Sequence, residues 1–117
     1  MGKLVTLNKN KEFKRVYSKG KYAASPSLVT YVLKSKSRKN RIGITTTKKI
    51  GNAVQRNRCR RIIRAAYAQI KNNLLIGNDI VFVAREKTVE LKTQNILRDM
   101  QYQFRRLNMI RISDKNN

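Results

Sequence analysis

RIGITTTKKIGNAVQRNRCRRIIR, the segment from Arg41 to Arg64, decides the fold of this chain. Its first six residues alternate apolar Ile42 and Ile44 with smaller or polar neighbours, a pattern typical of a β-strand with one apolar face. The lysine pair and glycine that follow favour a loop, and Asn52 is a residue type that commonly caps the start of a helix. The segment therefore predicts a strand, a basic loop and a helix in that order.

A long helix is expected from Asn52 to about Asn73, because the apolar residues there return to one side at about 100° per residue. This apolar arc comprises Cys59, Ile62, Ile63, Ala66, Tyr67, Ile70 and Leu74. Most of the remaining circumference carries Arg58, Arg60, Arg61 and Arg64. Arg56 projects nearer the apolar side, in the first turn, where its side chain could reach past the core.

The remaining periodicities predict a helix at 9–19, a short edge strand at 22–24, strands at 27–33 and 79–84, and a last helix near 92–106. This order, α-β-β-β-α-β-α, predicts a single-domain α+β sandwich over residues 1–117, with a flexible tail from about residue 108. The strands on either side of the long helix could pair in parallel, which would form a βαβ unit.

The charge balance predicts a polyanionic partner. The chain has 28 Lys and Arg against 6 Asp and Glu, a formal net charge of +22, and self-repulsion of that size opposes compaction. Nucleic acid and an anionic membrane are the two candidates. No run of about 18 apolar residues is present, and the first ten residues lack an apolar core of signal-peptide length. We therefore expect a cytoplasmic protein with no membrane partner.

The composition predicts neither a protein-borne catalytic residue nor a protein-bound metal. Histidine, the commonest general base and metal ligand, is absent, and Cys59 is the single cysteine. A two-metal phosphodiester site needs clustered carboxylates. The acidic residues are instead scattered, at Glu12, Asp79, Glu86, Glu90, Asp99 and Asp114.

The basic loop and helix favour phosphate binding over a merely solvated surface. Helix-start N–H groups favour anions, and arginine holds phosphate oxygens through two parallel donors. A solvated helix usually mixes charges so that residues four apart can pair, yet no acid occurs anywhere from Thr45 to Asn78.

KKIGNAVQRNRCRR resembles the signature of the bacterial ribonuclease P protein family, with its lysine pair, Gly-x-Ala-Val and Arg-Asn-Arg. The similarity covers nearly the whole chain. It includes the opening helix at 10–13, Tyr31 in its strand, the Arg-Ile-Gly at 41–43 and the strand at 80–85. Two positions depart from the family pattern: Thr46 stands where valine is usual, and Lys87 where a proline often occurs.

The resemblance implies a subunit of a tRNA-processing endonuclease. In that family the large RNA subunit performs the hydrolysis with bound Mg²⁺. The protein binds that RNA and the 5′ leader of precursor tRNA, and it lowers the Mg²⁺ requirement. The implied partners are ribonuclease P RNA and precursor tRNA, with no small-molecule substrate. The resemblance also implies a rare left-handed βαβ crossover, where general rules favour a right-handed one.

The resemblance assigns two sets of site residues. Expected contacts to the catalytic RNA are Lys48, Lys49, Arg56, Asn57, Arg58, Arg60, Arg61 and Arg64. The expected leader cleft is formed by Phe13, Tyr17 and Tyr31, together with Arg56 and Asn57. Aromatic rings beside a basic groove can stack on unpaired bases. At helical spacing such rings are also common core residues, and the two interpretations stay open because one ring can serve both.

Rival interpretations predict different partners. A general RNA-binding module, such as a ribosomal protein or an RNA chaperone, would share the charge and fold class. Arg56-Asn57-Arg58 in its strand-loop-helix context favours the ribonuclease P family. A DNA-recognition helix would need a short helix packed before it, whereas a strand precedes here. A membrane-surface helix is disfavoured because this helix also carries a core-forming face.

Overall fold

The computed structural model describes residues 5–111. It contains three α-helices, five strands and two short 3-10 helices: β1 (Val5–Thr6), α1 (Asn10–Lys19), β2 (Lys21–Ala24), β3 (Leu28–Lys34), β4 (Arg41–Thr45), α2 (Ala53–Ile70), η1 (Lys71–Asn73), β5 (Asn78–Ala84), η2 (Glu86–Glu90) and α3 (Thr93–Arg106). No helix among the described residues is long and apolar enough to cross a membrane.

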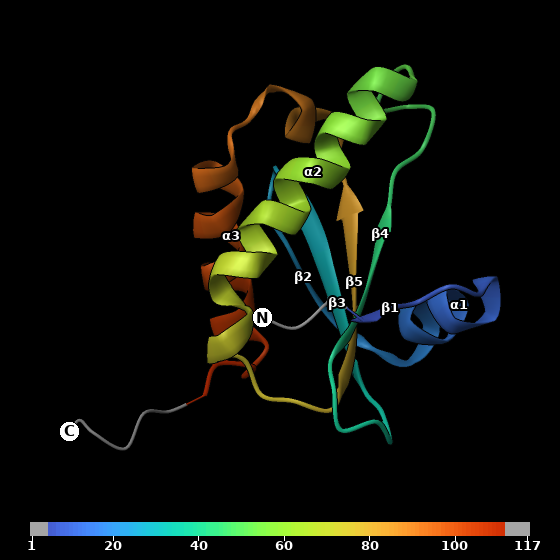
Figure 1. The fold of residues 1–117 in the computed structure, drawn as a ribbon, viewed down its shortest axis with the longest axis vertical. Helices are drawn as coiled ribbons and strands as arrows, with labels where there is room; N and C mark the ends of the chain where they lie inside the picture. Colours follow the sequence, from blue (N-terminus) through green and yellow to red (C-terminus); the bar gives the residue numbers. More distant parts are fainter. Residues whose placement is uncertain (1–4, 112–117) are drawn as a thin grey trace.

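The strands form one mixed sheet in the order β1-β4-β5-β3-β2. β4 pairs in parallel with both β1 and β5, while β3 pairs antiparallel with β5 and β2. Helices α2 and α3 cover one face of this sheet and α1 lies against the other (Figure 1). The expected parallel pairing across the long helix is confirmed as β4-α2-β5, whereas the left-handed sense of that crossover stays an expectation from the family resemblance.

The main core lies between the sheet and the layer of α2 and α3. All seven residues of the predicted apolar arc are buried in it. Phe82 of β5 lies at its centre, with ring centroids 5.7 Å from Tyr67 and 6.1 Å from Phe104, both edge to face. Burial raises the pKa of the Cys59 thiol, so this side chain remains protonated and packs as a small apolar group.

The smaller cluster under α1 leaves part of the other sheet face open. Only Leu7, Val16 and Val81 are fully buried there, and Phe13, Tyr31, Leu33 and Val83 are partly covered. The ten-residue α1 is too short to cover a sheet of five strands. The sheet therefore has one face covered by α2 and α3 and one face that α1 covers only in part. A binding site can form on the partly covered face.

The α+β class and the order of the predicted helices and strands are confirmed, and the structure adds β1 and the two 3-10 helices. The two-residue β1 was not predicted, since it is too short for an alternation to show. The long helix ends at Ile70 and continues as one 3-10 turn to Asn73. The chain also stays packed past the predicted start of the flexible tail, because Met109 is buried and Ile110 bridges to Leu74. Residues 112–117 of that tail lie outside the described residues.

Candidate nucleic-acid interface

The start of α2 is fixed by reciprocal capping. The Asn52 side chain accepts a hydrogen bond from the Gln55 backbone N–H, and the Gln55 side chain accepts one from the Asn52 N–H, both at 2.9 Å. Gly51 precedes the cap with φ 141°, and a Cβ there would meet the Gln55 amide oxygen at 1.9 Å. Glycine is therefore required at this turn. The turn leaves Lys48 and Lys49 exposed beside the helix start.

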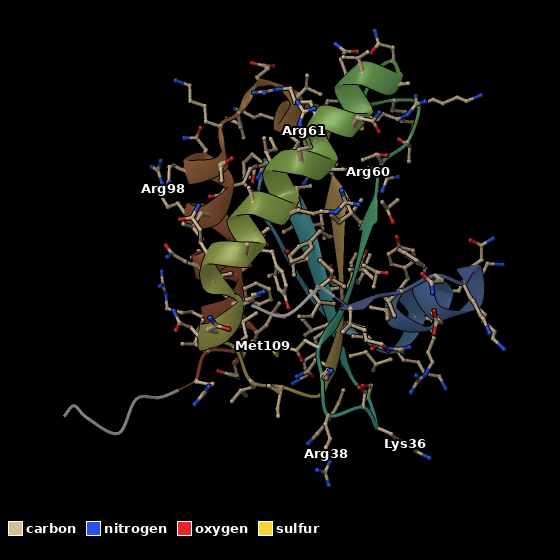
Figure 2. All side chains as sticks on the ribbon, viewed as in Figure 1. Lys36, Arg38, Arg60, Arg61, Arg98 and Met109 are labelled. Atoms are coloured by element: carbon tan, nitrogen blue, oxygen red, sulfur yellow. The ribbon has the colours of Figure 1, made fainter. Side chains whose placement is uncertain are left out.

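The flank of α2 that faces β4 carries Arg56, Arg60 and Arg64, spaced four residues apart. Arg60 donates to the Ile44 carbonyl at 3.0 Å and to the Thr46 hydroxyl at 3.1 Å, which fixes its guanidinium along β4 (Figure 2). Arg64 lines a hollow beside β4 together with Arg60 and Phe13. Arg56 donates to the Gly51 carbonyl at 2.7 Å. Three of the predicted arginines thus share one side of the helix.

Arg58 lies on the opposite flank. Its Nε donates to the Val89 carbonyl at 3.1 Å and its Nη2 to the Leu91 carbonyl at 3.0 Å. These bonds tie α2 to η2 and to the residue that follows it. The structure therefore does not bring Arg58 together with Arg60, although the sequence motif contains both. Asn57 and Arg61 are exposed on the outer side of the helix.

Helix α1 runs beside β4 and contacts it at three successive places. Glu12 pairs with Arg41, the Phe13 ring lies against Gly43, and the Tyr17 hydroxyl shares a 2.6 Å hydrogen bond with the Thr45 hydroxyl. A Cβ at position 43 would lie 2.5 Å from the Phe13 ring, so glycine is needed for this close approach. Side chains at 41, 43 and 45 share one face of the strand, which is why a single helix reaches all three.

Between α1 and the start of α2 lies an open hollow, hereafter the α1 cleft. Two of the three aromatic residues predicted for the cleft, Phe13 and Tyr17, form part of its wall, and Arg60 lies on the α2 side. Its lining residues are Asn10, Phe13, Lys14, Tyr17, Ile44, Thr45, Thr46 and Arg60. Arg56 and Asn57, also predicted for the cleft, are not among them. The cleft combines aromatic, hydroxyl and guanidinium groups on one surface.

Tyr31 extends this surface across the sheet. Its ring lies edge to face with Tyr17 at 5.1 Å and tilted against Tyr22 at 5.4 Å. Tyr22 pairs with Tyr31 in the β2–β3 register, so both side chains point to the α1 face. Tyr17 is 36% exposed and Tyr22 63%, while Tyr31 is partly covered between them. The rings pack against one another, and those of Tyr17 and Tyr22 are also open to solvent. This geometry is compatible with both predicted roles, packing in the protein and stacking on an unpaired base.

Sequence reasoning missed Tyr22 as a site residue and placed it only in an edge strand. The signal that could have found it is the strand register, because Tyr22 becomes a neighbour of Tyr31 only when the β2–β3 hairpin is paired. The register depends on the turn at 25–27, which the residue pattern alone does not determine.

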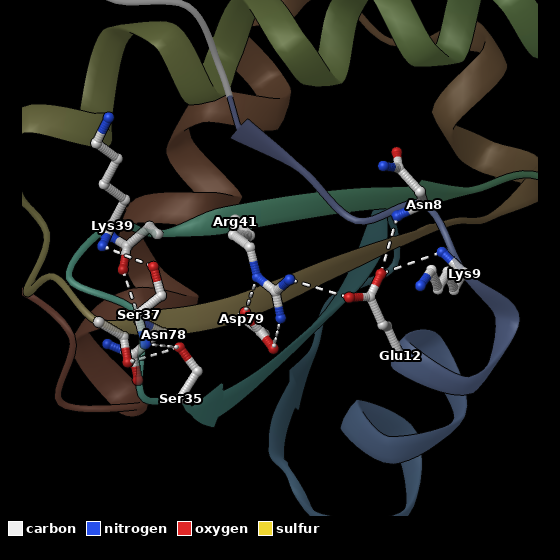
Figure 3. A network of polar contacts seen from close by, with 11 residues as sticks. Asn8, Lys9, Glu12, Ser35, Ser37, Lys39, Arg41, Asn78 and Asp79 are labelled. Atoms are coloured by element: carbon white, nitrogen blue, oxygen red, sulfur yellow. Dashed lines mark hydrogen bonds and ion pairs between the residues drawn. The ribbon is translucent and has the colours of Figure 1, made fainter.

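A partly buried ion network holds α1 on the sheet (Figure 3). The Arg41 guanidinium donates two bonds of 2.9 Å to Asp79, whose side chain is only 2% exposed, and a third of 3.0 Å to Glu12. The Glu12 carboxylate also accepts the backbone N–H groups of Asn8 and Lys9 at 3.1 Å. These backbone donors, with a smaller effect from Arg41, lower the pKa of Glu12. The network therefore sets where Phe13 and Tyr17 lie.

The described residues contain no group of three or more histidine, cysteine or acidic side chains that could hold a metal ion. No acidic side chain is among the residues that line the α1 cleft, and Glu12 of α1 is bonded to Arg41. The fold and surface together define a strongly basic α+β sandwich in which an arginine-bearing helix borders an aromatic cleft.

Comparison with known proteins identifies the family. Residues 1–108 match the family model described as Ribonuclease P. The ribonuclease P protein components of Bacillus cereus (strain B4264) and Bacillus anthracis (strain CDC 684 / NRRL 3495) are each 38% identical over 113 residues, which cover 96% of this chain and 98% and 95% of theirs. The chain belongs to the ribonuclease P protein family, and as such it is a subunit of an endoribonuclease of tRNA processing.

Solved structures agree with the fold. The Staphylococcus aureus RNase P protein gives a TM-score of 0.81 at 30% identity, covering 92% of this chain and 99% of that one. The RNase P protein from Thermotoga maritima gives 0.74 at 24% identity, covering 83% and 92%, which supports the fold alone.

Proposed function

We propose that this chain binds the catalytic RNA along α2. We propose further that it holds the single-stranded 5′ leader of precursor tRNA in the α1 cleft and over the adjoining cluster of Tyr17, Tyr31 and Tyr22. In this way it supports Mg²⁺-dependent removal of the leader by the RNA subunit. The observation that carries the proposal is the continuity of the surface. Tyr17 belongs both to the cleft that Arg60 borders and to the aromatic cluster with Tyr31.

The chemistry of this surface fits an unpaired strand. Exposed rings offer stacking platforms to bases of any sequence, and adjacent guanidinium groups offer donors to the phosphates. A duplex would present its bases only as edges in a groove, and its stacked interior could not reach Tyr31. The leader is the single-stranded part of a precursor tRNA, so the cleft would distinguish precursor from mature tRNA.

The protein residues supply binding and orientation, and the metal chemistry falls to the RNA. The residues that line the α1 cleft include no carboxylate, the ligand type that Mg²⁺ prefers, so they offer the ion no anionic ligand. By neutralising phosphates, the basic α2 flank would reduce the Mg²⁺ concentration that the folded RNA needs.

The test is cleavage of precursor tRNA by a bacterial ribonuclease P RNA at low Mg²⁺, with and without this protein. We expect the protein to restore accurate 5′ cleavage that the RNA alone does not perform. The matched control is the Tyr31→Ala protein assayed on precursors with and without an extended leader. Tight RNA binding with unchanged cleavage would contradict the proposal and favour a general RNA-binding module.

A further inference from the structure

The outer face of α3 is a second surface that combines arginines with an exposed tyrosine. Residues 98, 102 and 106 recur every four positions along this helix, so Arg98, Tyr102 and Arg106 form one stripe. Tyr102 is 48% exposed, and the Arg106 guanidinium lies 6.0 Å above its ring centroid. Arg105 is exposed beside them. Nothing in the proposed cleft function uses this stripe.

The rotation of α3 is fixed from the inside. The fully buried Gln103 side chain donates to the Leu28 carbonyl at 2.9 Å and to the Ser25 hydroxyl at 3.0 Å, and it accepts from Thr30. On the same helix Asp99 turns inward and accepts from Ser27. These bonds anchor α3 to the sheet and leave the arginine stripe facing outward, as Arg98 does in Figure 2.

The charges on this stripe have no carboxylate partner within the described part of the chain. The two ion pairs found there both belong to Arg41, on the other side of the sheet. A merely solvated helix would gain from acids four residues away, yet the one acid of α3, Asp99, is bonded to Ser27. Three guanidinium groups around an open ring are therefore left without a counter-charge in residues 5–111.

We propose that the outer face of α3 is a second binding site for single-stranded RNA, in which a base stacks on Tyr102 and the guanidinium groups of Arg98 and Arg106 contact the neighbouring phosphates. The two arginines are about 12 Å apart along the helix axis, which accommodates a short run of nucleotides on either side of the ring. The Arg106 guanidinium already lies over the tyrosine ring, so part of the site is pre-organised.

This site is separate from the α1 cleft because the sheet lies between them. α3 packs with α2 on one face, and the cleft lies under α1 on the other (Figure 1). A strand held in the cleft cannot stack on Tyr102 without passing round the edge of the sheet. The chain could thus hold two unpaired RNA segments at once, and the inference does not depend on what the cleft binds.

The experiment uses the full chain carrying Tyr31→Ala, which weakens the cleft, and a short fluorescent oligouridine as the probe. In this background Tyr102→Ala should weaken binding at least about fivefold, and Tyr102→Phe should keep the affinity because the ring is retained. An oligouridine with photoreactive thiouridine should cross-link to the α3 peptide that contains residue 102.

A charge-matched pair of variants separates a site from a general effect of charge. Arg98→Gln with Arg106→Gln removes two positive charges from the stripe. Lys36→Gln with Arg38→Gln removes the same charge from the exposed β3–β4 loop, which is outside the stripe, at the bottom of the molecule in Figure 2. We expect the first pair to lower the salt slope of oligouridine binding by about 1.4, since each phosphate contact to a single strand contributes about 0.7, and the second pair to leave it nearly unchanged.

Three outcomes would overturn the proposal: equal effects of the two charge pairs, no effect of Tyr102→Ala, or cross-links confined to the cleft tyrosines. A stripe that binds anionic lipid vesicles but not oligouridine would also overturn it. Failure of the cleft function would look different, since it would appear as a loss of preference for precursor over mature tRNA with the α3 results intact.

Discussion

The two flanks of α2 use the same residue type for different purposes. On one flank Arg58 gives its Nε and Nη2 donors to the backbone carbonyls of Val89 and Leu91. On the other, Arg60 bonds to Ile44 and Thr46 and faces the α1 cleft. The two residues are only two positions apart, which on a helix turns their side chains about 200° away from each other. The arginines of this motif therefore lie on two different surfaces of α2.

The difference between the flanks shows which arginines are structural. Val89 lies in η2 and Leu91 directly follows it, so both carbonyls are outside the sheet and have no strand partner among the described residues. Arg58 donates to both carbonyls and so joins α2 to η2 and to Leu91. Arg60 bonds to β4 at its open side and keeps its remaining N–H groups towards the cleft. We now expect Arg58 to act mainly on stability and Arg60 mainly on RNA binding.

The largest expected effect is that of Arg58→Ala on stability. Removal of two charge-assisted bonds should lower the free energy of unfolding by about 2 to 3 kcal/mol, because two carbonyls lose their donors. Urea denaturation measures this. The control is Arg61→Ala on the exposed outer side of the same helix, which should change stability by less than about 0.5 kcal/mol.

The salt dependence of RNA binding tests the same comparison with Arg60→Ala and Arg58→Ala. Arg60→Ala should reduce the slope of log K against log salt for catalytic-RNA binding by about 1, and Arg58→Ala should leave it nearly unchanged. An equal reduction by both would mean that the rotation of α2 does not separate the two roles, and that Arg58 meets phosphate as the sequence motif first indicated.

On the cleft side, Tyr31→Ala should weaken precursor tRNA binding by about 1 to 3 kcal/mol, the range for loss of one stacked base, and should leave mature tRNA binding nearly unchanged. Competitive binding of the two tRNAs measures the difference. Tyr31→Phe is the matched control, since it keeps the ring. Equal losses for precursor and mature tRNA would show that Tyr31 is only a packing residue between Tyr17 and Tyr22.

Much of the fold could be predicted because its signals are local. The apolar arc of α2 depends on spacing alone, and all seven of its residues are buried as predicted. Asn52 and Gly51 mark the helix start through capping and backbone conformation, which depend on adjacent residues. β1 left no such signal, because its two residues are held only by pairing with β4.

The site was less predictable because its contacts are remote in sequence. The partners of Arg58 are 31 and 33 positions away, and Arg41 meets Asp79 across 38. Helical periodicity put Arg58 on the polar side but could not show that η2 returns to cover it. Tyr22 joined the aromatic cluster only through the β2–β3 register. Composition predicts that arginines and tyrosines form the surface, and tertiary pairing decides which of them do.

A smaller effect on the free energy of unfolding is expected when the ion network that positions α1 is weakened. Glu12→Gln keeps the capping oxygen but loses the charge that meets Arg41, so it should cost about 1 kcal/mol at neutral pH. Because the pKa of Glu12 is lowered in the folded protein, its contribution is fully present above the ordinary glutamate value of 4.5 and is lost as the pH falls through the lowered pKa.

The measurement is the free energy of unfolding of both proteins against pH. The difference between wild type and Glu12→Gln isolates this carboxylate from the others, and it should shrink below about pH 4.5. A difference that stays constant down to low pH would show that the charge of Glu12 does not hold α1, and that the capping bonds alone do.

The smallest expected effect concerns Thr46, which directly follows β4 and lines the α1 cleft. Its hydroxyl accepts from Arg60 Nη2, so Thr46→Val removes one of the two bonds that orient this guanidinium beside the cleft. The Ile44 carbonyl still holds Nη1. We therefore expect precursor tRNA binding to weaken only about twofold, or about 0.5 kcal/mol, with the salt slope unchanged because the charge is retained. Tighter precursor binding by Thr46→Val would mean instead that the threonine hydroxyl holds Arg60 back from the phosphates.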